Sequence, residues 1–139
     1  MIDRTVEILR RGGVVAFPTE TVYGLGADAT NARAVERVFQ IKGRPSTNPL
    51  ICHVADAGIA RRYARVWPLA AQQIADAFWP GPVTIVLPKT EAIVSTVTAG
   101  LETVGLGETV LDIGSGGGIE DVTGVAIGSP IHRRGGHVA

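Results

Sequence analysis

Several residue types that mark specialised protein classes are scarce in this sequence. Cys52 is the one cysteine among 139 residues, which excludes an internal disulfide and a metal site built from several cysteines. Long apolar runs are also absent, and no stretch approaches the roughly 20 residues that span a bilayer. The N-terminus lacks a charged region followed by an apolar stretch, so no secretory signal is expected. These absences predict a cytoplasmic protein without membrane contact.

Net charge is missing as well, because 13 Lys and Arg residues balance 13 Asp and Glu residues. The net charge therefore does not indicate a protein that binds polyanions through bulk charge, although it is compatible with a local basic patch. What the sequence does contain fits a globular protein, with 45% apolar and 19% charged residues. The length predicts a single domain with one core.

Glycine is distributed unevenly and indicates a boundary. Residues 1–104 hold 8 of the 18 glycines, whereas residues 105–139 hold the other 10. The charge balance changes at the same place, from 11 basic and 9 acidic residues to 2 basic and 4 acidic residues. We therefore predict a partial domain over residues 1–106 and a glycine-rich segment, foreign or disordered, over residues 107–139.

Alternating helix and strand signals run through the first part. Caps and apolar spacing predict helices over residues 3–11 and 31–41, from Asp56 to before Trp67, and over 69–78. Short apolar runs predict strands over residues 14–17, 50–54, 83–87 and 103–106. Glycines and hydroxyls predict a loop or irregular turn over residues 19–30. The order predicts an α/β (α+β) fold, a sheet covered by helices.

The loop after the first strand carries polar groups suited to a ligand. Thr19, Glu20 and Thr21 directly follow a buried strand, where ligand sites of α/β sheets commonly lie. Gly24 and Gly26 let the backbone approach a bound molecule. The alternative is a turn whose hydroxyls satisfy only its own backbone.

A second loop combines two cations with an amide. Lys42 offers a compact ammonium and Arg44 a planar fork, which together suit a polyphosphate, and Asn48 adds a donor and an acceptor. A solvated basic turn is the alternative. His53 lies on the next apolar strand, where a lone histidine is more often a hydrogen-bonded core residue, and Cys52 is expected to face the other side as a small hydrophobe.

Together these segments resemble the YrdC-like family, the threonylcarbamoyl-AMP synthases. The likeness runs through GGVVAFPTETVYGLG at 12–26, KGRP at 42–45, NPLI at 48–51 with His53, WPGPVT at 79–84 and TAGLETVGL at 98–106. It covers about residues 3–106 in the family's own order and spacing.

The resemblance implies a fold, a reaction and partners. The fold is a twisted mixed sheet with flanking helices and a positively charged concavity. The reaction joins L-threonine, bicarbonate or CO2, and ATP with its Mg2+ into threonylcarbamoyl-AMP, releases pyrophosphate and serves the t6A modification of tRNA. Double-stranded RNA, tRNA and other proteins of the t6A pathway are the implied partners.

The resemblance also assigns roles to six residues: Thr21 and His53 to L-threonine, Lys42, Arg44 and Asn48 to ATP, and Thr103 to the neighbourhood of the nucleotide. The chemistry agrees with this set. The threonine amine captures CO2 as a carbamate, whose oxygen attacks the α-phosphorus, so two anions must meet among cations. Alignment and charge neutralisation suffice, and we expect neither a protein nucleophile nor a metal bound by the protein itself.

The likeness ends at Gly107, where the family usually continues with an arginine. A later Ser-x-Asn segment of the nucleotide site is absent, so we interpret the domain as truncated relative to the family. Residues 107–118, GETVLDIGSGGG, resemble instead the first motif of class I methyltransferases, whose glycines let the backbone approach S-adenosylmethionine. The alternative is a flexible glycine-rich tail.

Three functional hypotheses follow. The first is an L-threonylcarbamoyladenylate synthase-like nucleotidyltransferase, recognised by threonine-dependent release of pyrophosphate. The second is a non-catalytic, double-stranded RNA-binding module, recognised by salt-sensitive RNA binding without ATP turnover. The third is a binder of S-adenosylmethionine that depends on Asp112.

Overall fold

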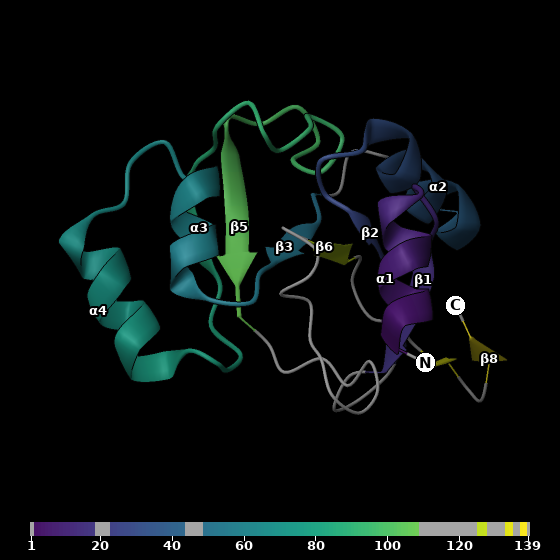
Figure 1. Ribbon diagram of the computed structural model, residues 1–139, viewed down its shortest axis with the longest axis horizontal. Coiled ribbons are helices and arrows are strands. Elements are labelled where there is room, and N and C mark those ends of the chain that lie inside the picture. The colour runs from purple at the N-terminus through teal and green to yellow at the C-terminus, as the bar shows by residue number, and fades with distance from the viewer. Residues whose placement is uncertain are drawn as a thin grey trace.

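A computed structural model describes residues 2–18, 23–43, 49–108, 125–127, 133–134 and 137–138 (Figure 1). The elements are α1 (Ile2–Arg10), β1 (Val15–Pro18), β2 (Tyr23–Asp28), α2 (Ala32–Lys42), β3 (Ile51–His53), α3 (Ala57–Tyr63), α4 (Leu69–Phe78), β4 (Ile85–Pro88), β5 (Thr103–Gly107), β6 (Val125–Ile127), β7 (Arg133–Arg134) and β8 (His137–Val138). None of the helices in these ranges is long and apolar enough to cross a membrane.

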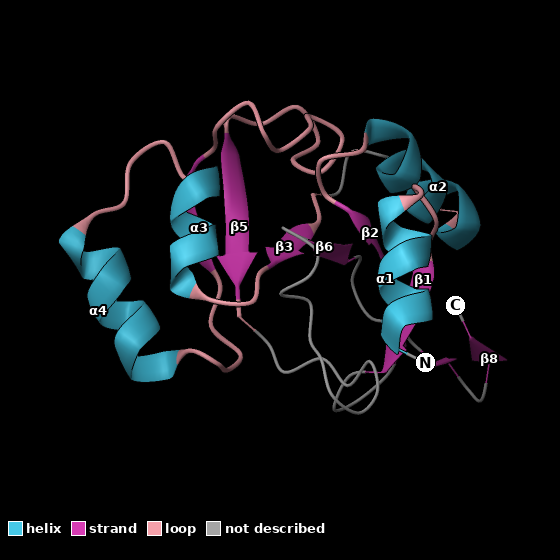
Figure 2. Ribbon diagram, in the orientation of Figure 1, coloured by secondary structure: helices cyan, strands magenta, loops and turns pink. Residues whose placement is uncertain are grey.

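The strands β1 to β6 form one mixed sheet in the order β1-β2-β6-β3-β5-β4. β3 and β5 run parallel, and the other neighbouring pairs are antiparallel. Figure 1 shows β5 and β3 turned relative to each other, and Figure 2 shows helices interspersed with the strands. The predicted mixed α/β architecture is therefore confirmed.

Local signals in the sequence explain where the helices begin and end. The Asn31 side chain accepts a hydrogen bond from the Ala34 N–H at 3.2 Å and caps α2, and Gly43 ends that helix with a left-handed φ of 63°. The Asp56 carboxylate accepts from the Ile59 N–H at 2.9 Å and caps α3. Both starts agree with the predictions from the sequence.

The prediction of a loop over residues 19–30 is wrong for residues 23–28, which form β2. This strand pairs with β1 on one side, where Val15 lies opposite Gly26, and with β6 on the other, where Ala27 lies opposite Ala126. Pairing on both sides outweighs the low strand propensity of its glycines, because backbone hydrogen bonds do not depend on the side chain. Residues 19–22 lie outside the described part.

The main core lies on one face of the sheet. Cys52 of β3 and both Val104 and Leu106 of β5 are buried in it, together with residues of α2, α3 and α4. Side chains alternate along a strand, so Ile51 and His53 belong to the opposite face. We call this opposite face of β3, β5 and β4 the outer face. The predicted separation of Cys52 and His53 onto two faces is confirmed by the burial of Cys52.

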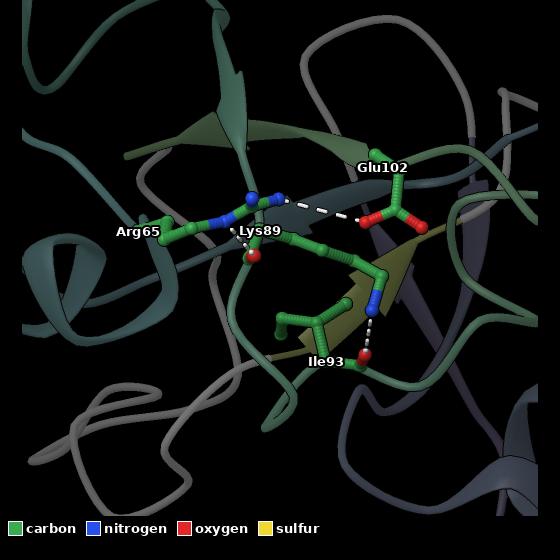
Figure 3. A network of polar contacts seen from close by, with 4 residues as sticks. All are labelled: Arg65, Lys89, Ile93 and Glu102. Carbon is green, nitrogen blue, oxygen red and sulfur yellow. Dashed lines mark hydrogen bonds and ion pairs between the residues drawn. The ribbon is translucent and has the colours of Figure 1, made fainter.

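A buried lysine fastens the connection between β4 and β5 (Figure 3). Lys89 is 8% exposed, and its ammonium donates to the Ile93 carbonyl at 3.1 Å. Its own carbonyl accepts from Arg65 Nε at 3.4 Å, and the Arg65 guanidinium lies 3.5 Å from the Glu102 carboxylate. The connection then crosses the core, where the Val97 carbonyl accepts from the Leu50 N–H at 2.8 Å. Lys89 thus holds a segment that supports the start of β3.

Replacing Lys89 by alanine is expected to lower the free energy of unfolding by about 2–3 kcal/mol, because it leaves a cavity and a buried carbonyl without its donor. Replacing Glu102 by alanine is expected to cost less than about 0.5 kcal/mol, since both partners of its ion pair are largely exposed. Urea denaturation of both variants measures the difference. Equal losses in the two variants would contradict this role of Lys89.

Candidate functional site

The predicted site residues that the structure describes lie on three elements. His53 ends β3, Thr103 begins β5, and Lys42 forms the last residue of α2. His53 pairs with Gly107, so His53 and Thr103 share the outer face at a separation of about 13 Å along the strands. Both residues therefore lie on the outer face, too far apart to contact each other. Thr21, Arg44 and Asn48 lie outside the described residues.

Lys42 is placed by the end of α2 rather than by the sheet. It is half-buried, and Gly43 turns the chain out of the helix directly after it. A cation in the last turn also interacts favourably with the negative end of the helix dipole. Gly43 thus fixes where the chain leaves α2 after Lys42.

The environment of His53 keeps its imidazole neutral. Burial lowers the pKa of His53 to about 4, so the ring carries no charge at neutral pH. A neutral imidazole offers one N–H donor and one acceptor nitrogen. His53 can therefore hydrogen-bond an amino acid, whereas it cannot neutralise a phosphate.

Cys52, the neighbour of His53 on the core face, does not supply a nucleophile at neutral pH. Burial raises the pKa of its thiol to about 12, and the negative charge of Asp28 adds to the effect. The thiolate is the reactive form of cysteine, and burial suppresses it here. Cys52 consequently acts as a packing residue.

Two carboxyl groups, those of Asp56 and Glu108, lie close to the ends of β3 and β5. Desolvation raises the pKa of Glu108, and the charge of Asp56 raises it further. The Glu108 carbonyl accepts from the Gly81 N–H at 2.9 Å, which ties this strand end to the segment before β4. Within the described ranges, no group of three His, Cys, Asp or Glu residues could hold a metal ion. Sequence reasoning assigned no role to Glu108, although it lies two residues after the strand predicted over residues 103–106, where ligand sites of α/β sheets commonly lie.

The outer face also carries apolar residues that sequence reasoning missed. Ile51 of β3 and Val86 of β4 both lie opposite Gly105 of β5, and both side chains are exposed. The alternation of side chains along the predicted strand could have placed Ile51 on the same face as His53. The register that aligns Ile51, Gly105 and Val86 depends on the pairing of three strands, which the sequence alone does not show. Chemically, this face combines a neutral hydrogen-bonding group, a hydroxyl and an apolar surface.

Comparison with known proteins gives one family model and several relatives. The Sua5_yciO_yrdC model, described as telomere recombination, matches residues 7–109. The threonylcarbamoyl-AMP synthase of Pyrococcus abyssi is 52% identical over 96 residues, which are 69% of this chain and 28% of that protein. The synthase of Bacillus subtilis is 49% identical over 106 residues, which are 76% of this chain and 31% of that protein.

Solved structures agree with this likeness. The P. abyssi Sua5 structure complexed with L-threonine has a TM-score of 0.79 and 39% identity, covering 92% of this chain and 38% of that one. Escherichia coli YciO has a TM-score of 0.73 at 23% identity, covering 92% of this chain and 62% of that one, and shows the fold alone. This chain thus spans about a third of the two synthases, 28% and 31% of their lengths.

Proposed function

The chain belongs to the Sua5/YciO/YrdC family, and on that premise we propose that it forms threonylcarbamoyl-AMP from L-threonine, bicarbonate or CO2, and ATP. One observation carries the proposal. The family match over residues 7–109 contains all six residues assigned to the substrates: Thr21, Lys42, Arg44, Asn48, His53 and Thr103. The named synthases among the relatives and the relative complexed with L-threonine support the choice of substrates.

The proposed reaction has two steps. The threonine amine attacks CO2, loses a proton and becomes a carbamate. A carbamate oxygen then attacks the α-phosphorus of ATP, and pyrophosphate leaves. ATP enters as substrate with its Mg2+, and the product serves the t6A modification of tRNA.

The chain's residues divide this work by charge. Lys42 and Arg44 offset the repulsion between carbamate and triphosphate, and Asn48 adds hydrogen bonds to the phosphates. Thr21 and the neutral His53 bind L-threonine by hydrogen bonds, and Thr103 lies beside the nucleotide. Because His53 is neutral, it adds no third cation beside Lys42 and Arg44 to attract the phosphates.

Pyrophosphate release by the purified chain, with L-threonine, bicarbonate and MgATP, tests the proposal. We expect release that requires threonine and falls about 100-fold or more when Lys42 and Arg44 are both replaced by alanine. Arg37→Ala is the matched control, because Arg37 is an exposed cation on the same helix, and it should keep full activity. A folded chain that releases no pyrophosphate would overturn the proposal, and salt-sensitive RNA binding by that chain would favour an RNA-binding module.

A further inference from the structure

The side of α4 that points away from the core is mostly apolar. Ala71 and Ala75 are buried in the core on the other side of this helix. Leu69 is 74% exposed, Phe78 is 57% exposed and Ile74 is 38% exposed. Helical spacing places the exposed residues of α4 on one side of the helix. We call this surface the α4 face, and it is formed by Leu69, Ala70, Gln73, Ile74, Ala77 and Phe78.

Charge is nearly absent from α4. Asp76 is the one charged residue of this helix, and its carboxylate accepts a hydrogen bond from Gln72 Nε2 at 2.8 Å. The Gln72 Oε1 atom accepts from the Trp67 indole N–H at 2.9 Å. The exposed positions of α1 and α2, in contrast, carry charged side chains such as Glu7 and Arg37. The α4 face therefore offers apolar contact rather than ion pairs.

The position of α4 leaves its exposed side open to another molecule. Figure 1 shows α4 at one end of the long axis of the molecule, beyond α3. The exposure of Leu69 and Phe78 shows that no element in the described ranges covers the α4 face. This helix packs on the core side of the sheet, whereas His53 and Thr103 lie on the outer face. A molecule bound to the α4 face would therefore leave the outer face accessible.

The α4 face is complementary to a second copy of itself. A two-fold axis through the middle of this ten-residue helix would pair residues that lie equally far from the middle. Leu69 of one copy would then lie opposite Phe78 of the other, and Ala70 opposite Ala77. Small residues would thus meet small residues, so the two helix axes could approach to about 8 Å. The antiparallel arrangement also brings opposite ends of the two helix dipoles together.

We propose that the α4 face binds a second copy of this chain, with the two α4 helices packed antiparallel about a two-fold axis. The six residues of the face expose about 500 Å² in total, so a pair would bury about 1,000 Å², which is near the lower limit for a specific interface. We therefore expect a weak dimer with a dissociation constant between about 1 and 100 µM. The proposal does not rest on the proposed reaction, because the α4 face contains none of the residues assigned to the substrates.

Sedimentation equilibrium over a concentration series from about 1 to 200 µM tests the dimer. Ala77→Arg is expected to weaken association about 100-fold or more, because it places an unpaired charge in the middle of an apolar interface. The substitution suits the folded monomer, since Ala77 is exposed and a cation in the last turn of a helix interacts favourably with its dipole. Gln40→Arg is the matched control, because it adds the same charge at an exposed position in the last turn of α2, and it should associate like the wild-type chain.

Cysteine cross-linking tests the antiparallel arrangement. A chain with both Ala70→Cys and Ala77→Cys should form a covalent dimer on mild oxidation, because each new thiol would face the other kind in the second copy. The two positions lie about 10.5 Å apart along one helix, too far for a disulfide within one chain. Ala70→Cys alone should not cross-link, since its two copies would be separated by the same distance along the axis. The wild-type chain controls for Cys52, which is fully buried.

The outcomes decide the proposal. A wild-type chain that is monomeric at every concentration would overturn it, and binding of phosphatidylcholine vesicles by that monomer would assign the α4 face to a lipid surface instead. A dimer that Ala77→Arg leaves intact would show that the copies associate through another surface. Equal cross-linking of the single and double cysteine variants would contradict the antiparallel arrangement.

Discussion

Proline at position 126 is expected to destabilise the whole sheet, by about 3–5 kcal/mol of unfolding free energy. β6 lies between β2 and β3, and Ala126 pairs with Ala27 on one side and with Cys52 on the other. A central strand has no solvent-facing edge, so proline removes a hydrogen bond wherever the N–H points. Ala27 and Cys52 are both fully buried, which places the disrupted row in the core.

Ala126→Gly is the matched control, because glycine keeps the N–H and is expected to cost only about 1 kcal/mol. Urea denaturation at neutral pH gives both values. Hydrogen exchange at the amides of Ala27 and Cys52 should quicken in the proline variant and stay nearly unchanged in the glycine variant. A proline variant that unfolds at the wild-type urea concentration would show that β6 does not hold the sheet together.

The same experiment tests whether the segment over residues 107–139 contributes to the stability of the sheet. We propose that this segment is distinct in origin from residues 1–106. A segment that merely follows the domain would tolerate proline at 126. A segment whose strand completes the sheet would not, whatever its origin. The sequence could not indicate β6, because Val125–Ile127 is too short to show a periodicity. Its place between β2 and β3 comes from pairing with strands far away in the chain.

Prediction from the sequence succeeded where the signals are local. Asn31 and Asp56 mark helix starts by their own side chains, and alternation alone put Cys52 and His53 on opposite faces. It failed for β2, whose glycines resemble a loop until both neighbouring strands are known. Thr21, Arg44 and Asn48 lie outside the described ranges, and the roles of all six assigned site residues stay predictions. The row of Ile51, Gly105 and Val86 across the outer face depends on the register of three strands, which no local pattern contains.

The stability of the chain is expected to fall as the pH falls from about 6.5 to about 4, and His53 is expected to cause a large part of that loss. Burial lowers the pKa of His53 in the folded chain to about 4, against about 6.5 in an unfolded chain. Between these two pKa values the unfolded state binds a proton that the folded state does not bind, so lowering the pH favours unfolding. The contribution is fully present above about pH 6.5. It amounts to about 2 kcal/mol, less than the full shift implies, because the imidazole keeps some exposure to solvent.

His53→Gln should remove this dependence while keeping a hydrogen-bonding side chain of similar size. The measurement is the free energy of unfolding of both chains at about pH 7 and about pH 4.5. Glu108 acts in the opposite direction, because its raised pKa makes the folded state hold a proton that the unfolded state releases. The pH dependence of the wild-type free energy of unfolding therefore combines opposing contributions. The difference between the two chains isolates the contribution of His53. Parallel profiles for wild type and His53→Gln would contradict the lowered pKa of the buried imidazole.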